Sequence, residues 1–478
     1  MRPPVRSKKM AYFAARPRQG VTAGQTHQKM VRIGLMTSPK SLLDRRVLMA
    51  GLGAAAVVPI WPAQGLAQGL AQGQTAVALQ ARADILALRP GAPETPIWSL
   101  GSPELNFRRG DTVEVAFANQ LPVPAVLNWR GLDGTSSAEP LTARVPLASG
   151  GKESQQLRLH HAGTFLCDPG LLGDGAARPS RARALVVRES EAVQVDRDEV
   201  CLIEDWRLRP DGTAIAPGTE PKDVVKDAAP VLTANGRFSL DISARTNERI
   251  RIRFINGCQR SVIAAKIENF VVRVMALDGQ PSEPFDARNG ALILAPGGRA
   301  DVFIDVTAPA GTNSSILVHD GKEARPIGKL VVSNAPPIRP TPFPPAQPLP
   351  SNGLPAQLDL KGAQRFDLPP GGPNDWGLPT NFKATSPPVF RAKTGRTVVL
   401  ALTNRAAVAT VFHLHGHHFR LLDRLDDGWK PFWLDTLAIE PGQTQRIAFA
   451  AEHAGRWLIE SVATDWAAPR LVRWYSVE

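Results

Sequence analysis

The feature of this sequence that most constrains its fold is a strand-like motif that occurs three times. Each copy begins at a polar turn, continues with alternating polar and apolar residues, and ends at an asparagine, which is Asn119, Asn256 or Asn404. Alternation with a period of two is typical of a β-strand that has one buried face. Because the same motif recurs along the chain, the sequence predicts three similar β-domains.

The composition favours short strands and turns over helices. The chain has 40 Gly and 43 Pro among its 478 residues, and many of them lie between the alternating segments, where turns are expected. No convincing amphipathic helix is found. We therefore predict an all-β fold of three consecutive Greek-key β-sandwich domains. Their predicted bounds are 74–190, 191–333 and 356–478, with a Pro-rich linker at 334–355.

Residues 1–73 are predicted to be an N-terminal extension with an export signal. Arg45 and Arg46 precede an apolar run that is rich in Ala and Gly and is followed by small residues suited to cleavage. This pattern is typical of a twin-arginine signal. It predicts a periplasmic protein with no transmembrane anchor after cleavage. A start at Met36 fits the signal better than a start at Met1.

The net charge of +12 lies mostly in that extension. The extension holds eleven Lys or Arg and one acidic residue, which leaves 45 basic and 43 acidic residues for the rest of the chain. A folded part that is close to neutral gives little support to nucleic-acid binding. We therefore expect no nucleic-acid partner.

Three cysteines, Cys167, Cys201 and Cys258, allow at most one disulfide. Export would permit such a bond, but burial as a small apolar side chain is common for free cysteine. We expect three buried thiols, and the sequence leaves open whether any two of them pair.

Two segments near the C-terminus carry the information on chemistry. Residues 413–419 read His-Leu-His-Gly-His-His-Phe, and residues 455–462 read Gly-Arg-Trp-Leu-Ile-Glu-Ser-Val. The first resembles the His-Leu-His-Gly-His motif of the multicopper oxidases. The second has the frame of their last motif, Gly-x-Trp-x-x-His-Cys-His, with Glu460, Ser461 and Val462 in place of the His-Cys-His. Other segments follow the family's order over nearly the whole mature chain, which implies three cupredoxin-like domains.

The resemblance also implies which positions once held copper. In that family, eight histidines hold a trinuclear cluster that reduces dioxygen, and one Cys with two His holds a blue copper that takes up electrons. Only His413 and His415 remain at the cluster positions here. The other six cluster positions hold Asn128, Arg130, Asp168, Gly170, Glu460 and Val462, and the four blue-copper positions hold Thr410, Ser461, Trp466 and Leu471. We therefore expect no catalytic residues and no cofactor, with residual copper binding at the two histidines as the alternative.

The replacements at these positions suggest an ion pair. Our hypothesis is that Arg130 occupies the space of a copper ion and pairs with Asp168 or Glu460, because a guanidinium can bond a carboxylate through two nitrogens. Replacing Arg130 by Ala should then lower stability by a few kcal/mol. In one alternative, His413 and His415 join the two carboxylates in binding Zn, Mn or Fe. In another, both histidines are structural and bond to the backbone and Asn128.

Four more histidines need an interpretation. His417 and His418 are not ligands in the resembled pattern, so we expect them to be partly exposed or to support a contact between domains. His160 and His161 are neighbours on a predicted strand and should point to opposite faces. We therefore expect this second pair to be surface residues that share no metal.

These observations favour a non-enzymatic protein. The chain is similar to a copper-free branch of the multicopper oxidase family that is exported by the twin-arginine pathway and stabilises the bacterial cell-division machinery. That similarity implies periplasmic protein partners, including divisome components, and a role as a scaffold. The alternative is a divergent oxidoreductase or a mononuclear metal-binding protein that uses the remaining His cluster.

Overall fold

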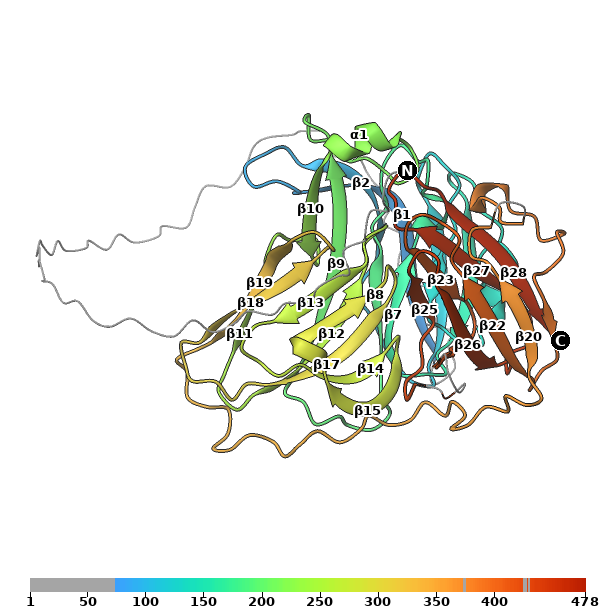
Figure 1. Ribbon diagram of the computed structural model, residues 1–478. Helices are drawn as coiled ribbons and strands as arrows, with labels where there is room; N and C mark the ends of the chain where they lie inside the picture. The colour runs from blue at the N-terminus through green and yellow to red at the C-terminus, as the bar shows by residue number, and fades with distance from the viewer. Residues whose placement is uncertain (1–73, 373–374, 424–427, 429) are drawn as a thin grey trace, which may run out of the picture. The chain divides into compact units, whose positions relative to one another are not determined.

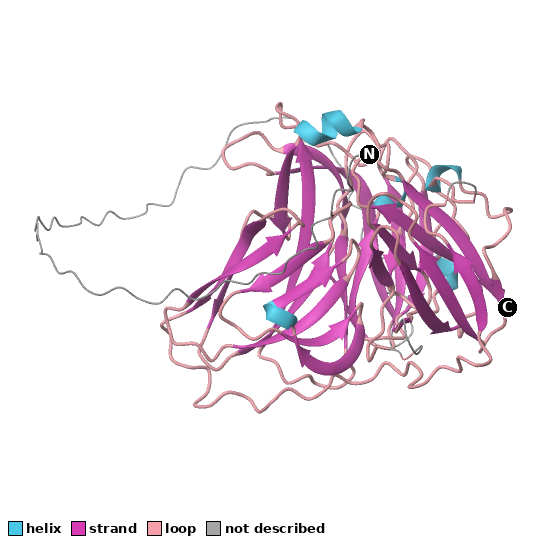
Figure 2. Ribbon diagram, viewed as in Figure 1, coloured by secondary structure: helices cyan, strands magenta, loops and turns pink. Residues whose placement is uncertain are grey.

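The computed structural model describes residues 74–478 except 373–374, 424–427 and 429. Strands make up most of its regular structure, and the helices of the described residues are short (Figure 2). The strands form six sheets, which follow one another along the chain as three pairs. The predicted export signal, with Arg45 and Arg46, lies outside the described residues.

The first pair of sheets has the strand orders β2-β1-β4-β6 and β3-β8-β7-β5 (Figure 1). Its strands are β1 (Gln74–Leu86), β2 (Thr95–Gly101), β3 (Leu105–Arg108), β4 (Thr112–Asn119), β5 (Asn128–Arg130), β6 (Lys152–Arg158), β7 (Gly163–Asp168) and β8 (Arg183–Arg188). The 3-10 helices η2 (Ser136–Ala138) and η3 (Gly170–Leu172) lie in its loops.

The second pair has the orders β10-β9-β12-β17-β14-β15 and β11-β19-β18-β13-β16. Its strands are β9 (Arg197–Leu208), β10 (Ala229–Ala234), β11 (Leu240–Ala244), β12 (Arg249–Asn256), β13 (Ile263–Ile267), β14 (Arg273–Leu277), β15 (Gln280–Asp286), β16 (Ala291–Leu294), β17 (Arg299–Asp305), β18 (Asn313–His319) and β19 (Ala324–Val332). Its short helices are α1 (Lys222–Asp227) and the 3-10 helix η4 (Arg288–Gly290).

The third pair has the orders β20-β22-β26-β24 and β21-β28-β27-β23-β25. Its strands are β20 (Gln364–Leu368), β21 (Arg391–Ala392), β22 (Thr397–Thr403), β23 (Thr410–Leu414), β24 (Arg420–Leu422), β25 (Thr436–Ile439), β26 (Thr444–Ala450), β27 (Gly455–Ala463) and β28 (Arg470–Val477). The 3-10 helix η5 (Pro379–Asn381) precedes β21.

The three pairs of sheets repeat one topology. In one sheet of each pair, the strand with the repeated motif (β4, β12 or β22) runs parallel to an earlier strand (β1, β9 or β20) and antiparallel to a later one (β6, β17 or β26). In the other sheet, an antiparallel pair (β7 with β8, β18 with β19, or β27 with β28) has a parallel strand on one side and an antiparallel strand on the other. This arrangement confirms the predicted all-β fold. The exact domain bounds stay a prediction.

The asparagine of each repeated motif explains why the motif recurs. Asn119, Asn256 and Asn404 are fully buried. In each case the side-chain oxygen accepts a hydrogen bond from the backbone N–H two residues later, and the side-chain nitrogen donates to two backbone carbonyls. The amide therefore satisfies the backbone of a turn that has left its sheet.

Each pair of sheets encloses its own apolar core, which the alternating residues of the strands fill. Phe117 and Leu185 lie in the first core, Ile252 and Val302 in the second, and Phe412 in the third. All three cysteines are buried in these cores and none forms a disulfide. The expectation of buried thiols is met.

The three pairs of sheets pack together as one compact unit. Strand β7 of the first pair contacts β12 and β17 of the second. Arg299 of β17 forms a buried ion pair of 2.6 Å with Asp435, which precedes β25 of the third pair. Residues 334–355 contain no strand or helix, yet Asn352 of this stretch is buried and donates to the carbonyl oxygen of Ala162.

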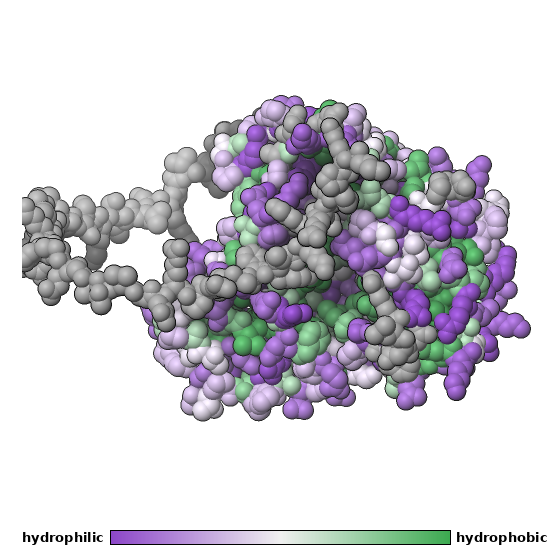
Figure 3. Space-filling model, viewed as in Figure 1, coloured by the Kyte–Doolittle hydropathy of each residue, from purple (hydrophilic) through white to green (hydrophobic). Residues whose placement is uncertain are grey.

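None of the described helices has the length and hydropathy needed to cross a bilayer. On the face shown in Figure 3, hydrophilic and hydrophobic residues are interspersed outside the grey atoms.

Candidate functional site

The centre of the site is the carboxylate of Glu460, which has no solvent exposure. Its strand β27 places it opposite His413 of β23. One oxygen, Oε1, accepts hydrogen bonds from Asn128 Nδ2 (2.8 Å) and His415 Nε2 (2.9 Å). The other, Oε2, accepts from Arg130 Nη2 and Arg470 Nη1, both at 2.7 Å. All four lone-pair positions of the carboxylate are therefore occupied.

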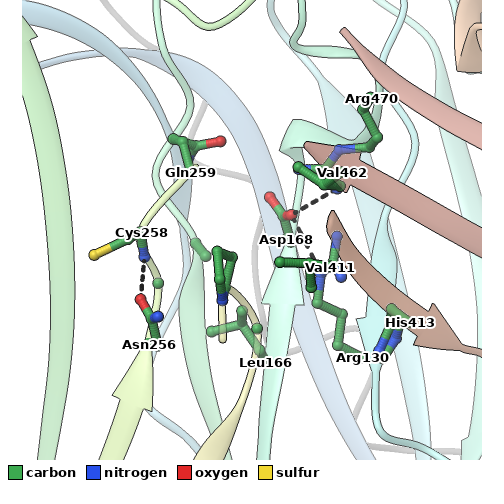
Figure 4. A pocket seen from close by; sticks show the side chains of 14 residues that line it. Arg130, Leu166, Asp168, Asn256, Cys258, Gln259, Val411, His413, Val462 and Arg470 are labelled. Carbon is green, nitrogen blue, oxygen red and sulfur yellow. Dashed lines mark hydrogen bonds and ion pairs between the residues drawn. The ribbon is translucent and has the colours of Figure 1, made fainter. Parts of the chain in front are cut away.

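The arginines also face a second carboxylate (Figure 4). Asp168 Oδ2 lies 3.6 Å from Arg130 Nε and 3.8 Å from Arg470 Nη1. Strand β7 pairs Asp168 with Asn128 of β5, which brings the arginine and aspartate to the same end of the sheet. The hypothesis that Arg130 pairs with Asp168 or Glu460 agrees with this geometry, since Arg130 meets both.

Burial raises the pKa of Glu460, but Arg130 and Arg470 together with His415 outweigh burial and hold that pKa well below its usual range. Arg470 was not singled out in the sequence. It stands one residue before Leu471 at the start of β28, where no periodicity or spacing marks it as a partner of Glu460. Only the antiparallel register of β27 and β28 brings the two together.

His415 bridges two carboxylates and is therefore a cation. Its Nδ1 lies 2.8 Å from Glu139 Oε1 and its Nε2 lies 2.9 Å from Glu460 Oε1. Because a carboxylate offers only acceptors, both ring nitrogens must carry a proton. Burial lowers the pKa of His415, but the two carboxylates outweigh it and raise the pKa to about 9. Glu139, which lies beside η2, was missed by the sequence analysis.

His413 is held in the neutral form. Thr436 donates its hydroxyl proton to Asp435 at 2.6 Å, so Thr436 Oγ1 accepts from His413 Nδ1 at 2.8 Å. The other nitrogen, Nε2, is buried and has no hydrogen-bond partner among the described residues. Burial is the largest cause that lowers the pKa of His413 to about 4. Its ring borders a cavity of about 30 Å³, which has room for one or two waters.

The two surviving histidines thus have different states, and neither bonds to Asn128. The interpretation in which both were structural and bonded to the backbone and Asn128 is wrong in its partners: Asn128 donates to Glu460, and the histidines meet side chains.

The residues at this site do not fit the trinuclear copper cluster that the fold family implies. Six of the eight imidazoles are replaced, and Arg130 places a fixed cation 2.7 Å from the carboxylate that would be a ligand. A guanidinium has no lone pair for a metal and repels a dication. The nitrogens of His415 both hold protons, so of the two remaining histidines only His413 offers a free lone pair, on Nε2.

The positions of the blue copper fit no better. Ser461 replaces the thiolate, and no cysteine occurs after Cys258 in the chain. Thr410 donates its hydroxyl to Asn404 Oδ1, and Trp466 packs on Ile215. Soft sulfur ligation is what defines such a centre. Leu471, Val462 and Gly170 offer no ligand atom in their side chains.

The four other histidines meet the sequence-based expectation only in part. His417 and His418 are both buried, whereas partial exposure was one of the two expectations. His417 Nδ1 lies 2.7 Å from the hydroxyl of Tyr475. His418 supports the contact between sheet pairs, since it meets Asp133 of the first pair at 2.7 Å and the carbonyl of Asp278 of the second at 2.8 Å.

His161 is also not a plain surface residue. Its side chain is 11% exposed, and its Nδ1 lies 3.1 Å from Asp133 Oδ2. His160 is exposed, as expected. The argument from strand geometry does not apply, because β6 ends at Arg158 and both histidines lie in the loop that follows. The argument also ignored partners elsewhere in the chain.

Comparison with known proteins agrees with this architecture. Residues 354–478 match a family model described as Multicopper oxidase. The chain is 24% identical over 421 residues to the multicopper oxidase MmcO of Mycobacterium tuberculosis, covering 76% of this chain and 78% of that protein.

Solved structures share the fold at low sequence identity. A multicopper oxidase from Pseudomonas thermotolerans superposes with a TM-score of 0.72 at 23% identity, over 85% of this chain and 99% of that one. Lac15, from a marine microbial metagenome, gives a TM-score of 0.68 at 24% identity, over 84% and 100%. The solved structures show that this chain has the multicopper oxidase fold, and the family match with the relative supports placing it in the multicopper oxidase family.

Proposed function

We propose that this chain is an exported multicopper oxidase-like protein that does not catalyse copper-dependent oxidation and acts through its surface as a periplasmic scaffold. The observation that carries the proposal is the state of Glu460. Its carboxylate receives four donors, two of which are guanidinium groups. A buried position that is neutralised by fixed cations has no need of a metal for charge balance.

The specific role that we propose is stabilisation of the cell-division machinery, with divisome components as partners. The proposal is supported by the twin-arginine pattern at Arg45 and Arg46 and by the loss of copper ligands, which the chain shares with the copper-free branch of the family. Deleting the gene in its source organism should lengthen the cells, and the wild-type gene should restore normal length. Normal cell length after deletion, under both ordinary and stress conditions, would reject the division role.

A copper-loading experiment tests the loss of oxidase chemistry. The mature protein is loaded with copper anaerobically, dialysed, and its spectrum and copper content are recorded for the wild type and the double variant His413→Ala, His415→Ala. We expect no absorption band near about 600 nm, the mark of a blue centre, and the same copper content in both proteins. Copper that is retained by the wild type and lost in the double variant would reject the proposal.

The second candidate function is a mononuclear metal-binding protein or a divergent oxidoreductase that uses His413, His415 and Glu460. One observation favours it: His413 Nε2 is buried and unpartnered. The ligand atoms of the three residues lie within 4.8 Å of one another. This candidate requires His415 to lose a proton and the arginines to move away from Glu460. The same double variant separates it from the scaffold.

A further inference from the structure

We propose that Asp133, His161 and His418 form a binding site for a zinc-class divalent transition metal, separate from the former copper positions. One oxygen of Asp133 lies 3.1 Å from His161 Nδ1 and 2.7 Å from His418 Nδ1. The three ligand atoms lie within 4.8 Å of one another. Two imidazoles and a carboxylate are donors that suit Zn²⁺.

The distances match the size of such a site. A tetrahedral zinc ion holds nitrogen and oxygen ligands at about 2.0–2.2 Å, which places neighbouring ligand atoms about 3.3 Å apart. The two measured separations from Asp133 are shorter than this by a few tenths of an ångström. Small side-chain movements would therefore open the cluster to an ion, without any change in the strands.

His418 has the orientation of a metal ligand. Its Nε2 donates a proton to the carbonyl oxygen of Asp278 at 2.8 Å. A hydrogen bond of this kind from the far nitrogen to a backbone carbonyl is the usual support of a metal-binding imidazole. With Nε2 committed in this way, Nδ1 is the nitrogen that faces Asp133. On binding, its proton leaves to solvent and the lone pair goes to the ion, so the site gains one positive charge.

The hydrogen bonds around His161 cannot all be satisfied at its Nδ1. The backbone N–H of Ala162 donates to Asn352 Oδ1, which fixes that amide so that its Nδ2 donates to Gln280 Oε1 at 3.0 Å. The nitrogen of Gln280 then points to His161 Nδ1 at 3.0 Å. If His161 Nδ1 accepts that bond, it faces an acceptor oxygen of Asp133 at 3.1 Å; if it donates to Asp133 instead, it faces the N–H of Gln280. A cation between His161 and Asp133 would remove this conflict.

An ion in this place would displace the Gln280 amide, whose nitrogen is 3.0 Å from one imidazole and 3.4 Å from the other. A cavity beside the cluster has space for a further ligand of the ion. Asp133 and His418 line a cavity of about 10 Å³ together with Glu452 and His453. This volume is close to the least that holds a single water, which would complete a four-ligand shell. Glu452 is exposed, and His161 is partly exposed, so an ion can reach the cluster from solvent.

The charge environment favours this cluster over Glu460. No arginine or lysine forms an ion pair with Asp133 among the described residues; its recorded ionic partners are His161 and His418. Glu460, by contrast, holds Arg130 and Arg470 at 2.7 Å. A dication therefore meets an exchangeable proton of His418 at Asp133 and the fixed cations of two arginines at Glu460.

The site would join all three pairs of sheets. Asp133 and His161 belong to the first pair, the displaced amide of Gln280 and the supporting carbonyl of Asp278 to the second, and His418 to the third. A bound ion should therefore raise the thermal midpoint of the whole protein, because it binds only the folded arrangement.

The test is a zinc titration of the untagged mature protein after removal of metal by a chelator. Free Zn²⁺ is reported by a chromophoric competitor, and four proteins are compared: wild type, His161→Ala, the matched control His160→Ala, and His413→Ala. We expect one Zn²⁺ per chain in the wild type. We expect affinity to fall on the order of 100-fold in His161→Ala and to stay within about twofold in the other two.

Three results would overturn the site: no stoichiometric Zn²⁺ binding in the wild type, equal affinity in the two neighbouring histidine variants, or loss of binding in His413→Ala. A second readout is the thermal midpoint, which Zn²⁺ should raise in the wild type and in His160→Ala but not in His161→Ala. His160 is exposed, and its ring stacks on His453 at 6.3 Å between centroids. Its variant therefore tests the effect of removing a neighbouring imidazole that does not contact Asp133. The outcome is independent of the scaffold proposal, which rests on Glu460.

Discussion

Replacing Glu460 by Gln tests whether the ion-pair network stabilises the fold. The substitution keeps the shape of the side chain and removes its charge. The amide oxygen can still accept from two donors, but the amide nitrogen is itself a donor and would face donors. Arg130, Arg470 and protonated His415 would then surround a neutral group in a fully buried place.

The expected loss of stability can be worked out from these contacts. The two hydrogen bonds to Oε2 come from charged groups, and each such bond contributes about 1.5–3 kcal/mol. Removing one partner of a buried ion pair costs about 3–5 kcal/mol, because the remaining charge is left uncompensated. Both routes give a similar figure. We therefore expect Glu460→Gln to lower the free energy of unfolding by about 3–5 kcal/mol.

The measurement is urea unfolding followed by tryptophan fluorescence, with a chelator present so that no metal contributes. The matched control is Glu478→Gln, since Glu478 forms an ion pair of similar length (2.6 Å) with Arg391 but both side chains are more than half exposed. An exposed pair contributes little to stability, so the control should unfold at the wild-type midpoint. Equal midpoints for Glu460→Gln and Glu478→Gln would refute the view that the network holds the site together.

Three further predictions can be checked on the same protein. Stability should fall as pH rises from about 6.5 through about 9. The pKa values of His415 and His418 are both raised to about 9 in the folded protein. The stability that each protonated ring contributes is therefore complete below the pKa of the unfolded chain and is lost as pH rises through the folded pKa. Each contribution is on the order of 3 kcal/mol, and thermal midpoints at pH 6.5 and 9.5 with chelator present report it; an unchanged midpoint would contradict the charged states assigned here. Gly416→Ala should destabilise by about 1–3 kcal/mol, since an added Cβ would lie 2.2 Å from the Trp457 ring at a backbone φ of +74°; a wild-type unfolding midpoint would show that the ring can move aside. Ser461→Cys should not by itself create a blue centre, because the two imidazoles are still missing; a band near about 600 nm after copper loading would disprove this.

The fold could be predicted from the sequence because its key signal is local. Asn119, Asn256 and Asn404 each end an alternating strand and bond the turn that follows within a few residues. A side chain that hydrogen-bonds the backbone of its own turn must stand at a fixed sequence distance from that turn, so the pattern can be found in the sequence. The repeated strand motif that ends at an asparagine therefore predicted three similar β units without any knowledge of long-range contacts.

The candidate site could be predicted only where the family frame supplied the long-range contact. That frame aligned Arg130 with Glu460, 330 positions apart, and the structure has their ion pair. It said nothing of Glu139 or Arg470, because neither stands at a former ligand position. Their roles depend on how a loop beside η2 and the first residue of β28 pack against β27, which no local pattern encodes.

The histidine cluster at Asp133 was missed for a related reason. His160 and His161 were judged against each other as neighbours on a strand, whereas both lie in the loop after β6. The partner of His161 lies in a loop of the same pair of sheets, and His418 arrives from the third. Three residues from loops carry no period or spacing, so their meeting is visible only in the folded chain.

The charges around the two clusters favour metal binding at Asp133 over Glu460. Around the former copper positions, three cations face three carboxylates: Arg130, Arg470 and His415 against Glu139, Asp168 and Glu460. A dication added there would leave two uncompensated charges in a buried space, unless His415 gave up a proton held with a pKa of about 9. At Asp133 the ion would also have to replace a proton, that of His418, whose pKa is likewise raised to about 9, but no guanidinium faces this carboxylate among the described residues, and exposed Glu452 lies beside the same small cavity. Burial makes each uncompensated charge costly, so a dication should bind first at the cluster whose carboxylate is not already paired with arginines. The guanidinium groups of Arg130 and Arg470 therefore disfavour a metal ion at Glu460 and leave the cluster at Asp133 open to one.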